Sequence, residues 1–156
     1  MSAKARVFTP ENRLANVLSS LEGIPAGELV VSAQARVAAL ETAVRGYVAM
    51  KLDEIMAFTD MAEHDLFAEC RTLGGLARNV AEVAGAAGLA AIGEVAAGID
   101  AMVESLVTSG VWHTDALRLH LDALALLNGR TGASAEEDEV VLARLRNMRK
   151  AIGVVE

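Results

Sequence analysis

The chain has 156 residues, which is enough for one compact domain. Hydrophobic residues make up 53% of it and charged residues 22%, so a disordered polypeptide is excluded, and an aromatic content of only 3% disfavours a β-sandwich. The net charge of −7 argues against a nucleic-acid partner. The single cysteine, Cys70, excludes a disulfide framework and a cysteine-based zinc site and is typical of a reducing cytoplasm.

The N-terminal part divides into an arm and a long helix. Residues 1–27 contain both prolines, Pro10 and Pro25, and predict an irregular arm with no apolar run suited to a signal peptide. A helix is expected from Glu28 to about Met61. One apolar stripe at spacings of three and four supports it: Val37, Leu40, Val44, Val48, Leu52, Ile55 and Phe58. No stretch is long enough to cross a bilayer, so we expect a cytoplasmic protein without membrane contact.

The second helix follows a polar break at residues 63–65 and has two distinct faces. Its apolar seam consists of Leu66, Cys70, Leu73, Ala77 and Val80. His64, Arg71, Gly75 and Arg78 follow at steps of seven, four and three, which places them together on the opposite side. The pattern therefore predicts that Cys70, Leu73 and Ala77 are buried and that Arg71, Gly75 and Arg78 are exposed.

Three further helices complete the predicted fold. One is expected from about Glu82 to Leu106, and the next begins after Thr114 as a plausible N-cap. The last opens with a capping box at Ser134 and Glu137, and its charges match the helix dipole, which predicts a solvated helix. Short connections favour an all-α, antiparallel up-down bundle over residues 28–128. Residues 129–156 are expected to form a loop and an additional C-terminal helix packed on the bundle or extending it.

Sites for metals and for nucleophilic catalysis are poorly supported. The three histidines lack the spacing that places two ligands on one helix face, and no Glu-x-x-His motif occurs. His113 is expected to serve a turn, and His120, between two leucines, to be a half-buried structural residue. Cys70 lies on the apolar seam, where a thiol packs as a small hydrophobic side chain. We therefore expect no enzyme active site, no metal and no cofactor.

The run from Arg71 to Ala81, RTLGGLARNVA, resembles the signature of the histidine phosphotransfer (HPt) domains. That signature is a histidine, any residue, Leu, Lys and Gly, followed by small or polar residues and an apolar one. Leu73, Gly75 and the run at residues 77–80 match it. Residues 7–10, the spacing from Ala39 to Tyr47 and residues 117–124 also resemble the CheE group of alphaproteobacterial chemotaxis-operon proteins, which carry an HPt-like core behind an N-terminal arm. The resemblance implies a four-helix bundle of HPt type in two-component signalling.

The chain departs from the family at the residue that carries the chemistry. Arg71 stands at the phosphoacceptor position, and Gly74 replaces the usual lysine. A guanidinium stays protonated and is no nucleophile, but it binds carboxylates in a bidentate manner. The resemblance thus implies a pseudo-phosphotransfer protein that binds a receiver domain or a histidine kinase. The expected partner-binding residues are Phe67, Arg71, Gly74, Gly75, Arg78 and Asn79.

Two alternatives remain open. In a second register, His64-Asp65-Leu66 supplies a histidine as phosphoacceptor, with Phe67 and Ala68 in place of the family's lysine and glycine. The chain would then be an active phosphorelay protein. The other alternative is a structural or dimerising helical bundle, and self-association as a homodimer is compatible with each of these interpretations.

Overall fold

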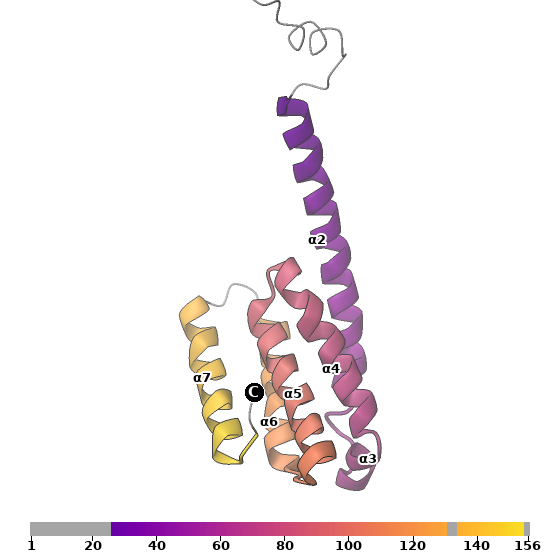
Figure 1. Ribbon diagram of the computed structural model, residues 1–156, viewed down its shortest axis with the longest axis vertical. Helices are drawn as coiled ribbons and strands as arrows, with labels where there is room; N and C mark the ends of the chain where they lie inside the picture. Colours follow the sequence, from indigo (N-terminus) through magenta and orange to yellow (C-terminus); the bar gives the residue numbers. More distant parts are fainter. Residues whose placement is uncertain (1–25, 131–133, 155–156) are drawn as a thin grey trace, which may run out of the picture. The chain divides into compact units, whose positions relative to one another are not determined.

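The computed structural model describes residues 26–130 and 134–154, and every regular element within these ranges is a helix (Figure 1). The chain divides into two units, Met1–Val37 and Ala38–Glu156. In the first unit the described residues form the start of helix α2, which spans Ala26–Met56. The predicted arm, residues 1–27, lies outside the described residues except for its last two, which already belong to α2.

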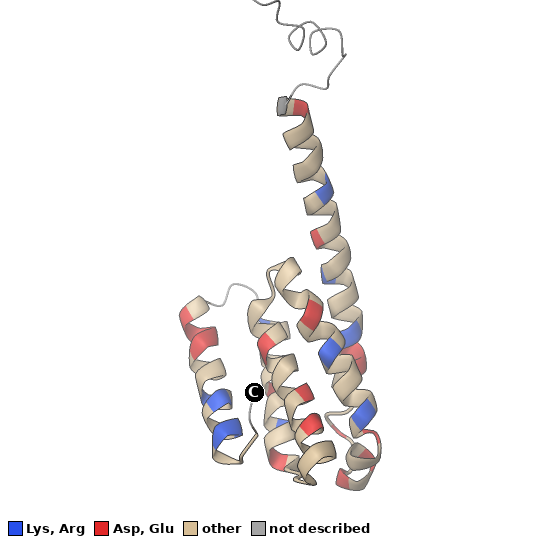
Figure 2. Ribbon diagram, in the orientation of Figure 1, with Lys and Arg blue, Asp and Glu red and all other residues tan. Residues whose placement is uncertain are grey.

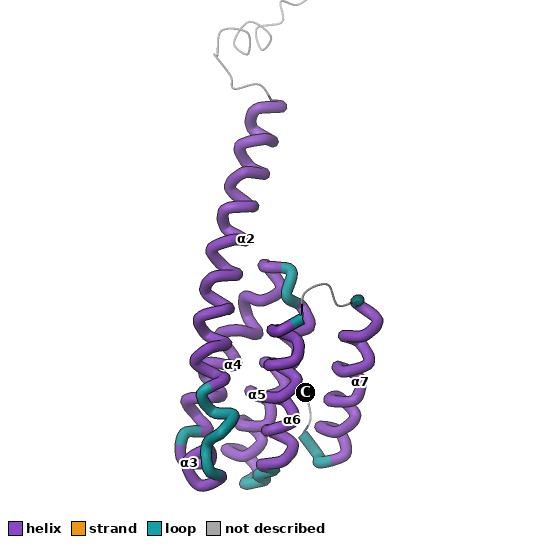
Figure 3. Tube along the Cα trace, turned by 180° about the vertical axis from the view of Figure 1, so that it is seen from behind, coloured by secondary structure: helices purple, strands orange, loops and turns teal. Residues whose placement is uncertain are grey.

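The second unit is a helical bundle. After the end of α2 come α3 (Glu63–Ala68), α4 (Cys70–Ala84), the short 3-10 helix η1 (Gly85–Ala87), α5 (Ala90–Ser109), α6 (Thr114–Gly129) and α7 (Ala135–Ala151). From α4 to α7 each helix reverses the direction of the one before, and α5 packs against α4, α6 and α7 (Figures 1 and 3). None of the described helices is both long and apolar enough to cross a membrane.

The buried core joins one face of each helix in the second unit. Its largest fully buried side chains are Val48, Leu52, Ile55, Leu66, Leu73, Val80, Val95, Ile99, Leu117, Leu121 and Leu124. These residues recur at helical spacing within each element, so the period of the apolar residues decides which face turns inward. Burial of aliphatic side chains at about 1.5–3 kcal/mol each is the main stabilising contribution.

The apolar stripe predicted along the first long helix is buried only in its second half. Val48, Leu52 and Ile55 lie in the core, whereas Val37 and Leu40 are exposed. The helix also ends at Met56, five residues before the expected end, and α3 begins at Glu63, inside the predicted polar break. A stripe at helical spacing shows which residues share a face, but it does not show how far along the helix its partners extend.

The helix predicted from Glu82 to Leu106 is instead two helices with a turn between them. Gly88 has φ +70°, the left-handed conformation that glycine adopts at helix ends. The amide of Leu89 donates to the carbonyl of Ala84 and that of Gly88 to the carbonyl of Gly85, the two hydrogen bonds of a Schellman motif. Small apolar residues on both sides of Gly88 hid this helix end from the pattern in the sequence.

One of the two N-caps predicted for the later helices is confirmed. The Oγ of Ser134 accepts a hydrogen bond from the amide of Glu137, so this predicted N-cap is confirmed. Thr114 is not the N-cap of α6: His113 occupies that position, and the Thr114 hydroxyl donates to Glu63 of α3. The last helix packs on the bundle, with Leu142, Leu145 and Arg149 of α7 buried, while its other face is solvated.

Candidate functional site

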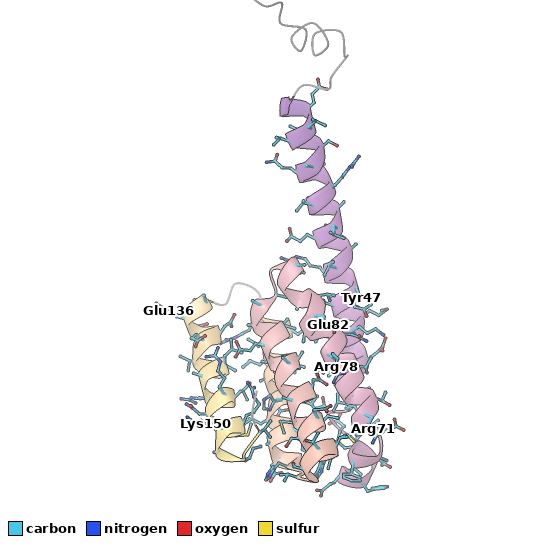
Figure 4. The ribbon with its side chains drawn as sticks, viewed as in Figure 1. Tyr47, Arg71, Arg78, Glu82, Glu136 and Lys150 are labelled. Carbon is cyan, nitrogen blue, oxygen red and sulfur yellow. The ribbon has the colours of Figure 1, made fainter. Side chains whose placement is uncertain are left out.

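The exposed face of α4 carries most of the residues expected to bind a partner. Arg71, Gly75, Arg78 and Asn79 are exposed, whereas Cys70, Leu73 and Ala77 are buried. The predicted phase of this helix is therefore confirmed, since residues three and four apart share a face. Figure 4 shows Arg71 and Arg78 along the same helix, with Glu82 one turn beyond Arg78.

Arg78 is held by a carboxylate on the neighbouring helix. Its Nε lies 2.9 Å from Oδ2 of Asp100 and its Nη2 3.0 Å from Oδ1, a bidentate pair between α4 and α5. Glu104 lies further away, with 3.8 Å between its Oε2 and Nη2 of Arg78. The hydrogen bond and the charge of Asp100 raise the pKa of Arg78 above its usual value. Its charge is thus largely neutralised by α5.

The Arg71 guanidinium, unlike that of Arg78, is not held by a carboxylate of α5. It forms no ion pair or hydrogen bond with any side chain in the described part of the chain. It lines a shallow groove of about 240 Å³ between α4 and α5, together with Gly74, Gly75, Arg78, Asp100, Val103, Glu104 and Val107. Figure 2 shows the basic residues of α4 beside acidic residues of α5. Among the groove's charges, Arg71 is therefore the cation available to a partner's anion.

Gly74 does not lie on this exposed face. It is buried, and a Cβ built on it would lie 2.9 Å from Cγ1 and 3.1 Å from Cβ of Val103 on α5. The first distance is shorter than real Cβ contacts and the second is tighter than most, so glycine at this position lets α4 and α5 approach each other. The structure places Gly74, one of the expected partner-binding residues, at the contact between α4 and α5, where a lysine would collide with Val103.

His64 lies on α3, apart from the arginine face of α4. The backbone departs from α-helical dihedral angles at Glu69, with φ −97° and ψ 8°, so the helical phase of α4 does not continue back to residue 64. The prediction that His64 projects with Arg71 and Arg78 from one helix is wrong for this reason. The His64 side chain is 83% exposed, and its Nε2 lies 3.0 Å from Oδ1 of the adjacent Asp65.

Phe67 lies on the same short helix as His64. Its ring is half exposed and meets the ring of Trp112 edge-on, with 5.4 Å between the ring centroids. Phe67 thus presents an accessible aromatic surface, but from α3 rather than from the face that carries Arg71.

His120 is more deeply placed than expected. Its side chain is fully buried, with Nδ1 2.8 Å from the carbonyl oxygen of Ala116 and Nε2 3.2 Å from Nη1 of Arg149. Because a guanidinium can only donate, Nε2 must accept, and Nδ1 carries the proton that is donated to Ala116. The pKa of His120 is lowered to about 4, chiefly by burial and also by the charge of Arg149, against the opposing effect of the hydrogen bond to Ala116. His120 is a neutral core residue.

A wide, open cavity lies at the end of the bundle where α6 begins. Its volume is about 720 Å³, and its walls include Glu63, Trp112, His113, Arg118 and Met148. The guanidinium of Arg118 is held there by the carbonyl of Met61, at 2.8 Å from Nη2. The sequence offered no signal for this cavity, because its walls come from α3, the start of α6 and the end of α7.

Two further findings bear on chemistry. Within residues 26–130 and 134–154, no group of three or more His, Cys, Asp and Glu side chains could hold a metal ion. Cys70 is free and buried, as its place on the seam predicts.

The chain was also compared with protein-family models, with curated proteins and with solved structures, and no match was found in any of the three.

Proposed function

We propose that this protein is a non-enzymatic, HPt-like signalling protein that binds a receiver domain or a histidine kinase in a two-component or chemotaxis pathway in the cytoplasm. The bundle would be of the antiparallel HPt type, with α7 as the additional C-terminal helix. The observation that carries the proposal is the exposed Arg71 beside Gly75 on α4, in the sequence run that resembles the HPt signature.

The chemistry of this face suits binding rather than phosphoryl transfer. A guanidinium stays charged and lacks a nucleophilic nitrogen, so Arg71 would accept no phosphoryl group. It can instead donate two parallel hydrogen bonds to a carboxylate, the group that lines the phosphorylation pocket of receiver domains. Gly75, one turn further along α4, has open space where a Cβ would stand. A partner's backbone could approach closely there.

Binding tests this proposal directly. Calorimetric titration of the wild type and of Arg71→Glu against candidate receiver domains should show at least about 2 kcal/mol of lost binding free energy, because the reversed charge would face aspartates. The binding affinity of the Arg71→Glu variant should also depend less on salt concentration than that of the wild type, since a close charge pair is removed. Arg144→Glu is the matched control: Arg144 is exposed on α7 and the substitution changes the net charge equally.

Arg144 is a better control than Arg118, whose guanidinium is partly buried and donates to the Met61 carbonyl. Equal affinities for the wild type and Arg71→Glu would overturn the proposal. They would favour the alternative interpretation, a structural or dimerising helical bundle.

A second candidate function is that of an active phosphorelay protein with His64 as phosphoacceptor. The high exposure of the His64 ring favours it, because a phosphodonor could reach an imidazole on α3. Incubation with a phosphorylated receiver followed by counting of acid-labile label decides the matter. Label in the wild type that is lost in His64→Gln and kept in His113→Gln would establish this function.

A further inference from the structure

The first half of α2 exposes a continuous apolar seam. Val30, Val37 and Leu40 on it are exposed by 55%, 65% and 62%, and Tyr47 by 38%. With Val30 at position a of a heptad, Val30, Val37 and Val44 fall at a, and Ala33, Leu40 and Tyr47 fall at d. We call these six residues the α2 seam. Helices with such a repeat pair with one another through a and d.

This stretch of α2 is poorly suited to standing uncovered in water. Valine is a mediocre helix former, and long helices in proteins draw most of their stability from packing an apolar face. Contiguous exposed apolar side chains mark interaction surfaces. Within the described residues, Val48 is the first fully buried residue of this helix, and Val44 is partly buried against the core. The other seam residues, Val30, Ala33, Val37, Leu40 and Tyr47, are exposed.

The charges that flank the seam select the partner. Arg36 falls at position g and Glu41 at position e of the following heptad. In a parallel, in-register pair of helices, g of one chain lies beside the next e of the other, so Arg36 would meet Glu41 of the second copy on both sides. An antiparallel pair would bring like charges together. Valine at all three a positions, with leucine at the central d position, also favours two strands.

From the heptad, the exposure and this charge complementarity we infer that the α2 seam is the interface of a parallel homodimer, in which two copies of α2 form a short coiled coil. The interface is remote in sequence from Arg71 and is independent of what the α4 face binds.

Sedimentation equilibrium of the full-length protein tests the inference with a closely matched pair of variants. Val37 and Val31 are both valines exposed by 65%, but Val37 lies at a and Val31 at b, outside the seam. The wild type should be dimeric. Val37→Glu should raise the dimer dissociation constant by about tenfold or more, because charges at a are buried in the pair, and Val31→Glu should leave it unchanged.

Circular dichroism and thermal unfolding of both variants serve as the control that the bundle remains folded. A wild type that is monomeric at every concentration overturns the inference and leaves the seam to a different partner. Equal association of Val37→Glu and wild type overturns it as well.

The orientation has its own test. Arg36→Glu should weaken the dimer, and the double variant Arg36→Glu/Glu41→Arg should restore it, because the pair is then reversed rather than broken. Oxidation should cross-link Ala33→Cys through the facing d positions but not Ala35→Cys, which lies at f on the outer side. A cross-link in Ala35→Cys alone, or an unrestored double variant, would contradict the parallel register.

Discussion

At the scale of single residues, the least expected feature is the contact of Gly98, His120 and Arg149 inside the bundle. These residues come from α5, α6 and α7, and both His120 and Arg149 are almost fully buried. A Cβ built on Gly98 would lie 2.9 Å from Cδ2 and Nε2 of His120 and closer still to Nη1 of Arg149. Gly98 thus leaves the room in which a buried imidazole accepts a hydrogen bond from a buried guanidinium.

Gly98→Ala should lower the free energy of unfolding by about 1–3 kcal/mol, because the added methyl group must displace a rigid ring and a buried charged group. Gly46→Ala is the control: Gly46 is also inside a helix, but nothing lies within 4 Å of its Cβ position. There the usual helix preference for alanine should make the substitution neutral or stabilising by up to about 1 kcal/mol. Urea unfolding of both variants measures the difference; equal effects would show that the three-residue contact is loosely packed.

At the scale of elements, α7 is held to the bundle by both polar and apolar contacts. Arg146 reaches Glu94 on α5, with 2.9 Å between Nη2 and Oε2, and also Glu139 on its own helix, with 2.8 Å between Nη1 and Oε1. The bond to Glu94 is the larger cause of the raised pKa of Arg146, and the bond to Arg146 lowers the pKa of Glu139. Together with buried Leu142 and Leu145, these contacts make α7 part of the bundle.

The turn between α4 and α5 depends on one glycine conformation. Gly88→Ala should cost about 1–2 kcal/mol of stability, because an L-residue at φ +70° brings its Cβ close to the neighbouring carbonyl oxygen. Gly85→Ala, three residues earlier, is the matched control, since Gly85 has φ −59° and open space at its Cβ position. Thermal unfolding that ranks the two variants equally would show that the Schellman turn can rearrange without cost.

At the scale of the whole molecule, the buried imidazole makes the stability of the fold sensitive to acid. The pKa of His120 is about 4 in the folded chain, against about 6.5 when it is unfolded. The folded state therefore binds fewer protons between these values, and its stability falls as the pH drops from about 6.5 toward 4. The whole loss amounts to about 3 kcal/mol, and above pH 6.5 this residue contributes no pH dependence.

Urea unfolding from pH 7 to pH 4.5 measures this slope. His120→Gln should flatten it, because glutamine does not titrate. Since the comparison is between slopes, it holds even where the His120 variant is less stable at every pH. A His120→Gln variant with the slope of the wild type would rule out this origin of the acid sensitivity.

The sequence by itself determined the features that depend on near neighbours along the chain. The all-α class, the inward face of α4 from Cys70 to Ala77 and the cap at Ser134 follow from spacings of three and four residues. The absence of proline after Pro25 permits the long helices from α2 onward. Such features are readable because a helix repeats every 3.6 residues and because its caps bond within one turn.

Only the tertiary structure decided which side chains meet across helices. It pairs Arg78 with Asp100, buries Arg149 beside His120, and packs Gly74 against Val103. It also ends the core of α2 at Val48, so that one apolar stripe is covered in one half and exposed in the other. These outcomes depend on residues more than twenty positions apart. The pattern within one helix shows which side chains share a face, but the helix that packs against it decides whether that face is covered.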